Sequence, residues 1–586
     1  MSRTFRVWAP RVSDMQLVIG ETRNAMTPAG VGWFACDVEA ADVGMDYAFS
    51  LDGGDPVPDP RSRSQPAGVH GPSRLVEPDQ PAAAQLWSGF PLHEAIVYEL
   101  HVGTFTPEGT FDACIVRLDH LQTLGINAIE LMPLAQYPGS RGWGYDGVDL
   151  FAPHTGYGGP DGLRRLVAAC HERGIAVIVD VVYNHLGPEG DYLPDFAPYF
   201  TERYSTPWGT AFNYDGADSD DVRRFVVENA EMWLRDYGCD GLRLDAVHAI
   251  IDMSPTHILE TISSRVAELA LETGRHLWVI AESDSNNPRL VRDRESGGYG
   301  LHAQWNDDFH HALHTLLTGE GFGYYEDFDG PTDLCTAIQQ AFVYAGRYSL
   351  HRRHTVGRAI GDLPLSRFIV YSQNHDQVGN RAAGERLCHL VSDGRARMAA
   401  ALTLLAPMIP LLFQGEEWAA SSPFQYFTDL DDEGLGKAVT NGRREEFRSF
   451  GWPPESVPDP QDVATFERSH LNWEERLEGE HAAMLDWYKT LIALRRETPG
   501  LIEGDPAAAT ATYDATRNLL LYSHAGLLVA CNLGDNEVGV PEASDASLIL
   551  AATAPASGDI AVLAPDSVSV WRCSQVPASR APRIGP

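Results

Sequence analysis

Alternating apolar and polar residues open the chain. The segments Phe5–Trp8, Met15–Ile19 and Gly32–Val38 alternate in this way and are separated by Gly, Pro and Asp. Alternation of period two predicts strands with one buried face, and the breaks predict turns. We therefore expect a β-sandwich over residues 1–91, with the Pro-, Gly- and Asp-rich residues 52–81 as the loop that leads out of it.

From about residue 95, short apolar runs alternate with stretches of helical length. Eight runs are strand candidates: Ala95–Leu100, Ala128–Leu131, Ile175–Val182, Gly241–Leu244, Leu277–Ala281, Ala303–Trp305, Arg367–Ser372 and Ile409–Phe413. Helices are expected between them, the clearest at Phe111–Leu124, Asp161–Arg173, Asp220–Tyr237 and Pro255–Glu272. Eight strands with intervening helices predict an α/β fold, a (β/α)₈ TIM barrel over residues 92–503. A doubly wound sheet is the alternative, but polar residues at the ends of several strands favour the barrel.

Two stretches interrupt the alternation, and a third region follows it. Residues 186–218 are rich in Pro, Gly and aromatic residues, and residues 418–476 are long and polar; both are predicted as loop insertions, which at this length are usually functional. After a helix predicted at Asp486–Glu497, strand-like runs return. We expect a C-terminal β-domain over residues 504–586.

Composition narrows the class of partner. The 81 acidic and 44 basic residues give a formal net charge of −37, which disfavours nucleic acid and anionic membranes as partners. The eight cysteines are far apart and form no C-x-x-C pair, which favours free buried thiols. The N-terminus has no apolar segment typical of a signal peptide, and the apolar runs are too short to span a bilayer. We therefore expect a cytoplasmic protein.

Three acidic residues each close a short apolar run: Asp245, Glu282 and Asp376. A carboxylate at the end of a buried strand is costly unless it has partners or a chemical task. A retaining glycosidase needs an ionised nucleophile and a protonated acid close together. Arg243 precedes Asp245 by two residues, on the same face of a strand, and would keep it ionised, whereas burial beside other acids would raise the pKa of Glu282.

Each of these acids, taken alone, has a simpler explanation. Any one could be a helix N-cap, and a single histidine is more often structural than functional. A zinc site is also conceivable for Asp and His at barrel strand ends, but no His-x-His pair occurs in the barrel region. Coincidence does not readily explain three acids at three strand ends. Together these acids favour an enzyme that hydrolyses a glycosidic bond.

The motifs around these acids resemble the α-amylase superfamily, glycoside hydrolase family 13. The resemblance rests on four segments that occur in the family's order: Asp180–His185, Gly241–Asp245, the strand before Glu282, and Asn374–Asp376. It implies a (β/α)₈ barrel with Asp245 as nucleophile, Glu282 as acid/base and Asp376 as transition-state stabiliser. No acidic loop cluster of the kind that holds calcium in amylases is evident, so we expect no required metal and no other cofactor.

Other segments resemble one trehalose-releasing branch of this superfamily. They include Arg243–His248, Ile280–Arg289 and Gln304–His310, and the likeness runs through most of the chain. It implies that the partners are malto-oligosyltrehalose, trehalose and water. Glycogen branching enzymes, which transfer the glycan to a sugar hydroxyl, are the alternative. A non-catalytic glycan-binding protein is a remote alternative, because such a protein would not need all three acids. In this setting the β-sandwich expected over residues 1–91 resembles a carbohydrate-binding module.

Further residues are expected to contact the sugar. Neutral imidazoles at His185 and His375 suit hydrogen bonds to sugar hydroxyls, and Tyr145 could stack on a ring. His248 stands where many α-amylases have lysine, which suggests a differently built acceptor side. The remaining predicted substrate contacts are Arg243, Trp305, Asp307, Asp308, Gln377, Asn380 and Glu417. Trp208, Trp305 and Trp418 are candidates for holding the trehalose unit.

Overall fold

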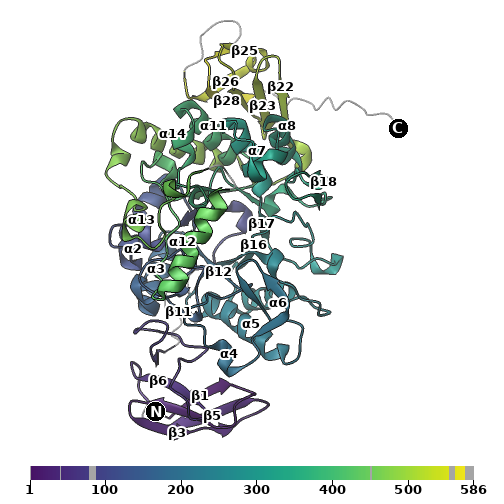
Figure 1. Ribbon diagram of the computed structural model, residues 1–586. Helices are drawn as coiled ribbons and strands as arrows, with labels where there is room; N and C mark the ends of the chain where they lie inside the picture. Colours follow the sequence, from purple (N-terminus) through teal and green to yellow (C-terminus); the bar gives the residue numbers. More distant parts are fainter. Residues whose placement is uncertain (1, 40, 78–86, 449–451, 554–560, 574–586) are drawn as a thin grey trace.

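Three parts follow one another along the chain in the computed structural model (Figure 1). The structure describes residues 2–39, 41–77, 87–448, 452–553 and 561–573. Two small sheets lie at the N-terminal end, a closed barrel surrounded by helices lies in the middle, and a further sheet lies at the opposite end (Figure 1). The last residues of the predicted 52–81 loop and of the predicted C-terminal domain lie outside the described residues.

The N-terminal part consists of two antiparallel sheets. The first has the order β1 (Arg3–Trp8), β5 (Trp33–Val38), β4 (Thr27–Pro28). The second has the order β3 (Thr22–Ala25), β2 (Met15–Ile19), β6 (Asp46–Leu51), β7 (Ser73–Arg74). Trp8 packs edge-on against Tyr199 at 5.4 Å, and the Trp33 indole N–H donates to Asp221. These contacts hold the first sheet against the barrel domain. Phe5 of the first sheet also packs against Tyr47 of the second, as expected of a β-sandwich.

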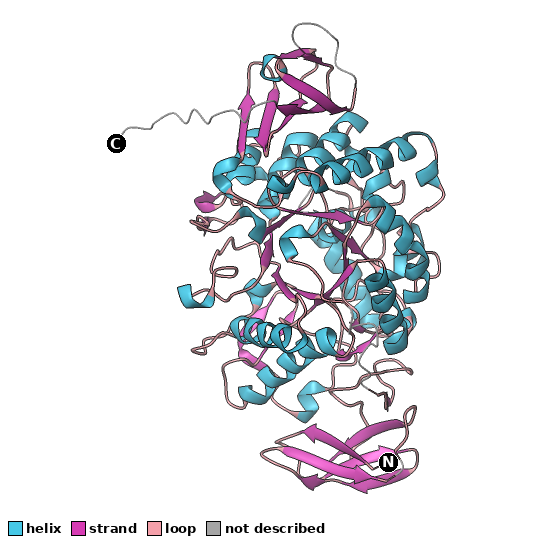
Figure 2. Cartoon of the chain, turned by 180° about the vertical axis from the view of Figure 1, so that it is seen from behind, coloured by secondary structure: helices cyan, strands magenta, loops and turns pink. Residues whose placement is uncertain are grey.

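Eight parallel strands form the closed barrel that the sequence predicts (Figure 2). In chain order they are β8 (Val97–Leu100), β9 (Ala128–Leu131), β12 (Ala176–Val181), β15 (Gly241–Leu244), β16 (Trp278–Ala281), β17 (Ala303–Trp305), β20 (Phe368–Val370) and β21 (Ile409–Phe413). Each strand pairs with the next in the chain, and β21 closes the ring against β8. All their residues are buried, which explains the continuous apolar runs in the sequence.

Side-chain alternation along these strands brings the acids to one axis. Ile178, Trp278 and Ile280 belong to a small apolar cluster that alternate strand residues build separately from the main core. Successive side chains of a strand point to opposite faces, so Glu282 follows Trp278 and Ile280 on the same face. Asp180 follows Ile178 in the same way. The polar residues therefore cap this cluster at the carboxyl ends of the strands.

The helices around the barrel begin and end largely where the sequence predicts. Helix α2 spans Phe111–Leu124; the Thr110 side chain caps its first turn, and Gly125, with φ of 101°, ends it. The other predicted helices are α3 (Gly159–Glu172), α5 (Ser219–Arg235), α6 (Ile258–Thr273) and α14 (Gly479–Arg496). Helix α14 begins seven residues before the predicted start at Asp486.

The two predicted loop insertions contain regular structure. Residues 186–218 include the short helix α4 (Leu193–Phe196) and the hairpin of β13 (Phe200–Thr206) with β14 (Gly209–Phe212). Residues 418–476 contain helix α12 (Glu433–Arg448) and helix α13 (Val463–Arg468). The loop interpretation was wrong for these segments, because polar surfaces and several glycines hide the helical period.

The C-terminal part is a five-stranded antiparallel sheet. Its order is β22 (Thr510–Asp514), β23 (Leu519–His524), β24 (Leu527–Asn532), β28 (Ser567–Cys573), β26 (Ala546–Ala551). The Tyr522 hydroxyl donates to the Leu405 carbonyl, and Arg395 of helix α11 (Asp393–Leu404) pairs with Asp566 at 2.8 Å. These polar contacts supplement apolar packing, because Leu520, Val529 and Val570 of the sheet belong to the same apolar core as the barrel helices.

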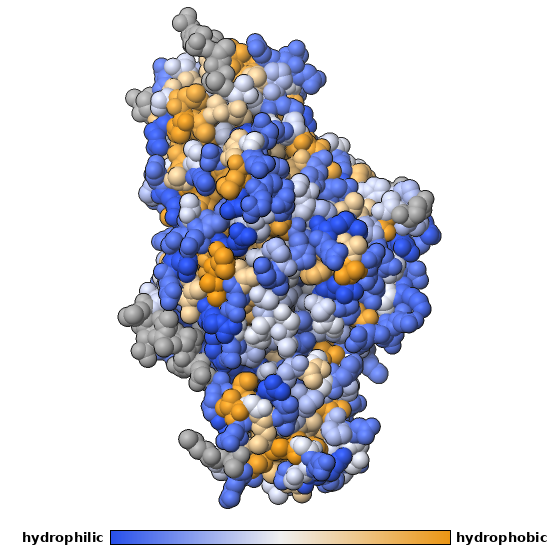
Figure 3. Space-filling view, turned by 90° about the vertical axis from the view of Figure 1, so that its left-hand side faces the viewer, coloured by the Kyte–Doolittle hydropathy of each residue, from blue (hydrophilic) through white to orange (hydrophobic). Residues whose placement is uncertain are grey.

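All eight cysteines are free thiols, as the sequence predicts, and most are buried. Among the described helices, none has the length and apolarity needed to cross a membrane. The face seen in Figure 3 is largely hydrophilic, with apolar residues in scattered patches, in keeping with the high acidic content of the chain.

Candidate active site

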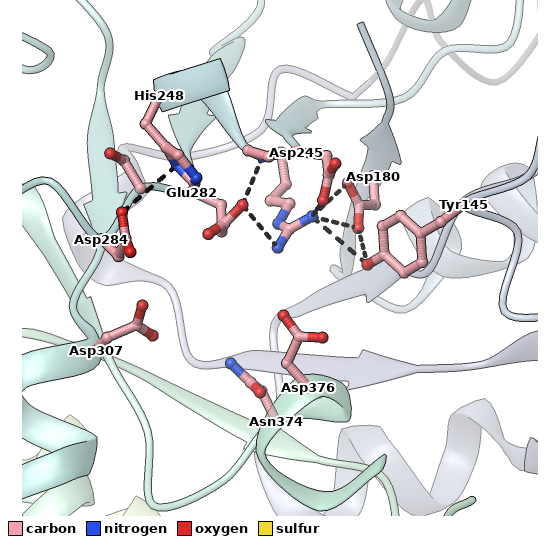
Figure 4. Close-up of polar contacts among 12 residues, drawn as sticks. Tyr145, Asp180, Asp245, His248, Glu282, Asp284, Asp307, Asn374 and Asp376 are labelled. Carbon is pink, nitrogen blue, oxygen red and sulfur yellow. Dashed lines mark hydrogen bonds and ion pairs between the residues drawn. The ribbon is translucent and has the colours of Figure 1, made fainter. Parts of the chain in front are cut away.

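One buried guanidinium organises the acids at the end of the barrel. The Arg243 side chain is fully buried, and its Nη1 donates to Asp245 Oδ1 at 2.9 Å and to Asp180 Oδ2 at 2.8 Å. Its Nη2 lies 3.7 Å from Glu282 Oε2. The two carboxylates that the sequence assigns as nucleophile and acid/base therefore lie against the same cation (Figure 4).

The strand ladder continues into these residues and fixes their backbone. The Asp245 N–H donates to the Val181 carbonyl, and the Glu282 N–H donates to the Leu244 carbonyl, both at 3.0 Å. Ala246, directly after Asp245, has φ of 41°, and its N–H donates to the Glu282 carboxylate. A non-glycine residue in this left-handed region is strained, and such strain clusters at functional sites.

The two carboxyl groups have different electrostatic surroundings. Burial raises the pKa of Glu282 well above its usual value, Asp245 and Asp307 raise it further, and Arg243 only partly opposes them. Asp245 instead accepts hydrogen bonds from Arg243 at 2.9 Å and from the Asn184 amide at 2.8 Å. Separate environments of this kind suit one protonated acid beside one ionised nucleophile.

The pKa values of the two histidines are shifted in opposite directions. Burial alone would lower the pKa of His375, but the Glu99 and Asp376 carboxylates outweigh it and raise the pKa to about 9. This shift favours a charged imidazole instead of the neutral one expected there, and the paired carboxylate of Glu99 is not evident from the local sequence. Burial lowers the pKa of His185, a direction that favours the neutral form. The Tyr145 hydroxyl lies 2.8 Å from His375 Nε2 and donates to Asp180.

Asp376 reaches the site from a helix instead of a strand. Strand β20 ends at Val370, and Asp376 lies in the first turn of the short helix α9 (His375–Gly379), which the Asn374 side chain caps. Its side chain is 44% exposed, the most open of the three acids. Figure 4 shows the carboxyl groups of Asp376, Asp307 and Glu282 around a common space.

Two hollows meet at these acids. The larger has a volume of about 630 Å³ and contains Asp245, Glu282 and the aromatic rings of Trp143, Tyr145 and Trp208. The smaller, of about 420 Å³, is lined by further aromatic rings, including Tyr324, Tyr325 and Trp452. Five residues line both hollows: Asp284, Asp307, Asp376, Asn380 and Glu446. The cleft therefore extends from the acids in two directions.

Most predicted site residues line this cleft. The larger hollow contains the three acids together with Tyr145, His185, His248, Asp307, His375 and Asn380, and Gln377 lines the smaller one. Trp208, on the β13–β14 hairpin, is 50% exposed and stacks beside His185, with ring centroids 5.6 Å apart. The sequence signal at strand ends thus identifies a real cluster in space.

Five other candidates do not reach the cleft. Arg243, predicted as a sugar contact, is fully buried and lines neither hollow, because its guanidinium is taken up by the carboxylates of the site. Trp305 is buried beneath the cleft, with Arg243 stacked 4.3 Å from its ring. Asp308 accepts from the Val343 and Tyr344 amides and holds the backbone there. Glu417 is fully buried and bonds to Tyr98 and His120, and the Trp418 indole donates to Glu475. Strand-end position could not reveal that Trp305 belongs to the apolar cluster inside the barrel. It also could not reveal that Asp308, Glu417 and Trp418 make their contacts outside the cleft.

Other cleft residues escaped the sequence reasoning. Asp284 lines both hollows, lies 3.8 Å from His248 and pairs with Arg352 at 3.1 Å. Its position in the loop that directly follows Glu282, at the carboxyl end of strand β16, is a signal that could have identified it. Arg443 and Glu446 come from helix α12, within the segment interpreted as a loop.

No group of three or more His, Cys, Asp or Glu side chains within the described ranges is arranged to hold a metal ion. The polar groups of the cleft are instead hydrogen-bonded to one another around Arg243. The cleft therefore offers a carboxyl group for proton transfer, Glu282, and a carboxylate that can act as a nucleophile, Asp245.

Comparisons with known proteins agree with this geometry. Residues 62–205 match the family described as alpha amylase, catalytic domain, and residues 507–570 match a domain of unknown function, DUF3459. The malto-oligosyltrehalose trehalohydrolase of Arthrobacter ramosus is 49% identical over 92% of this chain and 95% of its own length. A crystal structure from Salmonella typhimurium, described as a candidate α-amylase, superposes with a TM-score of 0.90 at 39% identity, covering 97% of both chains. A 1,4-alpha-glucan branching enzyme of Corynebacterium jeikeium is 26% identical over 73% of this chain and 62% of its own length.

Proposed function

The chain belongs to the malto-oligosyltrehalose trehalohydrolases of the α-amylase superfamily, and from this membership we propose the reaction and the roles of its residues. The protein is a glycosidase that hydrolyses the α-1,4 bond next to the terminal trehalose of malto-oligosyltrehalose. The products are trehalose and a shortened malto-oligosaccharide, so the activity belongs to trehalose biosynthesis.

The observation that carries the proposed mechanism is the shared contact of Asp245 and Glu282 with Arg243. Glu282, which retains its proton because its pKa is raised, donates it to the glycosidic oxygen. Asp245 attacks the anomeric carbon and forms a covalent glycosyl-enzyme while trehalose leaves. Glu282 then takes a proton from water, and the water oxygen displaces Asp245 with net retention.

Asp376 is assigned the stabilisation of the oxocarbenium-like transition state. Its carboxylate lies on the open side of the cleft, across from the other two acids (Figure 4). A negative charge placed where positive charge develops is among the largest catalytic contributions. The charged His375 and the hydroxyl of Tyr145 are assigned hydrogen bonds to the sugar at the cleavage site.

The two hollows support a substrate that extends on both sides of the bond. A glucan chain needs a long apolar and polar channel, and a disaccharide leaving group needs a second one. We assign the cleft as the joint binding surface for both parts, with the aromatic rings of the two hollows stacking on sugar rings. Hydrolysis is favoured over transfer, because the branching-enzyme relative is far less similar than the trehalohydrolases.

Product analysis separates these activities. The protein is incubated with maltotriosyltrehalose and, separately, with amylose, and products are identified by chromatography. We expect free trehalose and maltotriose from the first substrate and no new α-1,6 branches in the second. Branch formation without trehalose release would overturn the proposal. The Asp245→Ala variant should lose at least about 10⁴-fold in activity, and unchanged turnover would refute its role as nucleophile.

A further inference from the structure

Helix α12 forms a wall of the cleft and carries two adjacent arginines with different surroundings. Arg443 faces inward, lines the larger hollow and has only 13% of its side chain exposed. Arg444, the next residue, lines a separate outer hollow together with Lys437 and Asp459. The inner arginine is therefore placed to act on the site, and the outer one is not.

Arg443 holds the helix that carries Asp376. Its Nη1 donates to Asn380 Oδ1, and its Nη2 donates to the Gly379 carbonyl, both at 2.8 Å. Its guanidinium also stacks 4.7 Å from the Tyr426 ring centroid, which fixes its plane. The two acceptors lie at the carboxyl end of helix α9, three and four residues after Asp376.

Asn380 passes this constraint on to Asp376. Its Nδ2 donates to Asp376 Oδ1 at 3.2 Å, while its Oδ1 faces Arg443. A guanidinium can only donate hydrogen bonds, and an ionised carboxylate can only accept them. The amide between them must therefore turn its oxygen to Arg443 and its nitrogen to Asp376. A reversed amide would place a donor against a donor and an acceptor against an acceptor.

We propose that Arg443 is a positioning residue that orients the Asp376 carboxylate through the Asn380 amide. The inference rests on the proposed role of Asp376 in the reaction. Asn380, which the sequence predicts as a sugar contact, would then also link Arg443 to Asp376. Helix α12 is far in sequence from all three acids. Through this contact it contributes to the chemical step as well as to the wall of the cleft.

Kinetics of the Arg443→Met variant test the proposal with maltotriosyltrehalose as substrate. Losing a charged hydrogen bond that orients a transition-state stabiliser should lower kcat by about 10- to 100-fold and change KM by less than about threefold. Arg443→Lys should recover part of kcat, since an ammonium group still donates to one of the two acceptors. Arg444→Met, the neighbouring change of the same charge, should retain wild-type kcat.

A double-mutant cycle distinguishes positioning from a general structural effect. In an Asp376→Asn background the added Arg443→Met change should cost less than about threefold in kcat, because the group it orients is already disabled. A full repeated loss in that background, or wild-type kcat in the single variant, would refute the proposal. If Arg443→Met does not fold, the same cycle with Asn380→Ala answers the question. Failure of the wild-type enzyme to release trehalose in this assay would instead refute the proposed function.

Discussion

Single residues of this site acquire their chemistry from their neighbours. Glu282 and Asp245 both follow short strands. Burial and surrounding acids raise the pKa of Glu282, whereas Asp245 accepts hydrogen bonds from Arg243 and Asn184. The sequence indicates this difference through Arg243, whose two-residue spacing fixes its strand face. It does not indicate the charge of His375, because the Glu99 partner lies 276 residues away in the chain.

The alkaline side of the pH–activity profile should respond to Asp307. Glu282 acts in its protonated form, so activity is lost as pH rises through its raised pKa. Besides burial, the Asp307 charge helps to raise that pKa, and burial raises the pKa of Asp307 itself to about 7, so that it is charged in the alkaline range. Asp307→Asn should therefore shift the alkaline limb of kcat to lower pH.

Asp362→Asn serves as the control for this shift. Asp362 pairs with Arg292 on the surface and is 86% exposed, away from the cleft. The Asp362→Asn change should leave the alkaline limb of the kcat–pH profile at its wild-type pH. An alkaline limb that stays unchanged in Asp307→Asn would contradict the electrostatic account of Glu282.

The buried Glu99–His375 pair should make stability depend on pH. Because the pKa of His375 is about 9 in the folded protein and about 6.5 when unfolded, its stabilisation is fully present below pH 6.5 and disappears as pH rises to 9. Glu99→Gln should lower the free energy of unfolding by about 3 kcal/mol more at pH 6 than at pH 9.5. Urea unfolding followed by tryptophan fluorescence measures both values.

An exposed pair provides the comparison for that experiment. Glu433 contacts Lys437 on the surface of α12, where both side chains are largely exposed. Glu433→Gln should change stability little and equally at the two pH values. Equal destabilisation by Glu99→Gln at pH 6 and pH 9.5 would show that His375 is not charged in the folded protein.

At the scale of elements, local signals predicted some boundaries and missed others for physical reasons. Helix α2 and strand β9 begin and end at the predicted residues, because a capping threonine, a terminating glycine and apolar runs mark them. Helix α12 was missed, because Gly434, Gly436 and Gly442 weaken its local preference and contacts with the barrel hold it instead. The inward or outward direction of Glu417 likewise depends on packing across the fold.

The close packing of helix α9 offers a test at this scale. A Cβ atom on Gly379 would lie 2.1 Å from Trp143 Cζ2, so the Gly379→Ala change must displace either the Trp143 ring, which lines the larger hollow, or α9, which carries Asp376. A displacement near 1 Å of a catalytic group should reduce kcat by about 10²-fold, measured as trehalose release. Gly321→Ala, which meets no atom within 4 Å, should keep kcat unchanged. Full activity of Gly379→Ala would show that the position of α9 is not critical.

At the scale of the whole molecule, the barrel supplies the acids while a distant insertion completes the cleft. The sequence predicts the barrel because each strand is a short apolar run followed by a helix. It predicts the grouping of Asp245 and Glu282 because strand ends converge on one face, while Asp376 comes from the short helix after β20. It could not predict the second hollow, whose aromatic lining comes from several loops that meet only in the folded chain. We assign the glucan chain and the trehalose unit to these two hollows because the chain belongs to the trehalohydrolases.

Time-resolved ¹H NMR of maltotriosyltrehalose hydrolysis tests the central claim most directly, because it identifies both the bond and the stereochemistry. We predict free trehalose together with maltotriose that first appears as the α-anomer, before mutarotation, as double displacement by Asp245 requires. Release of glucose or maltose without trehalose, or initial formation of β-maltotriose, would contradict the account.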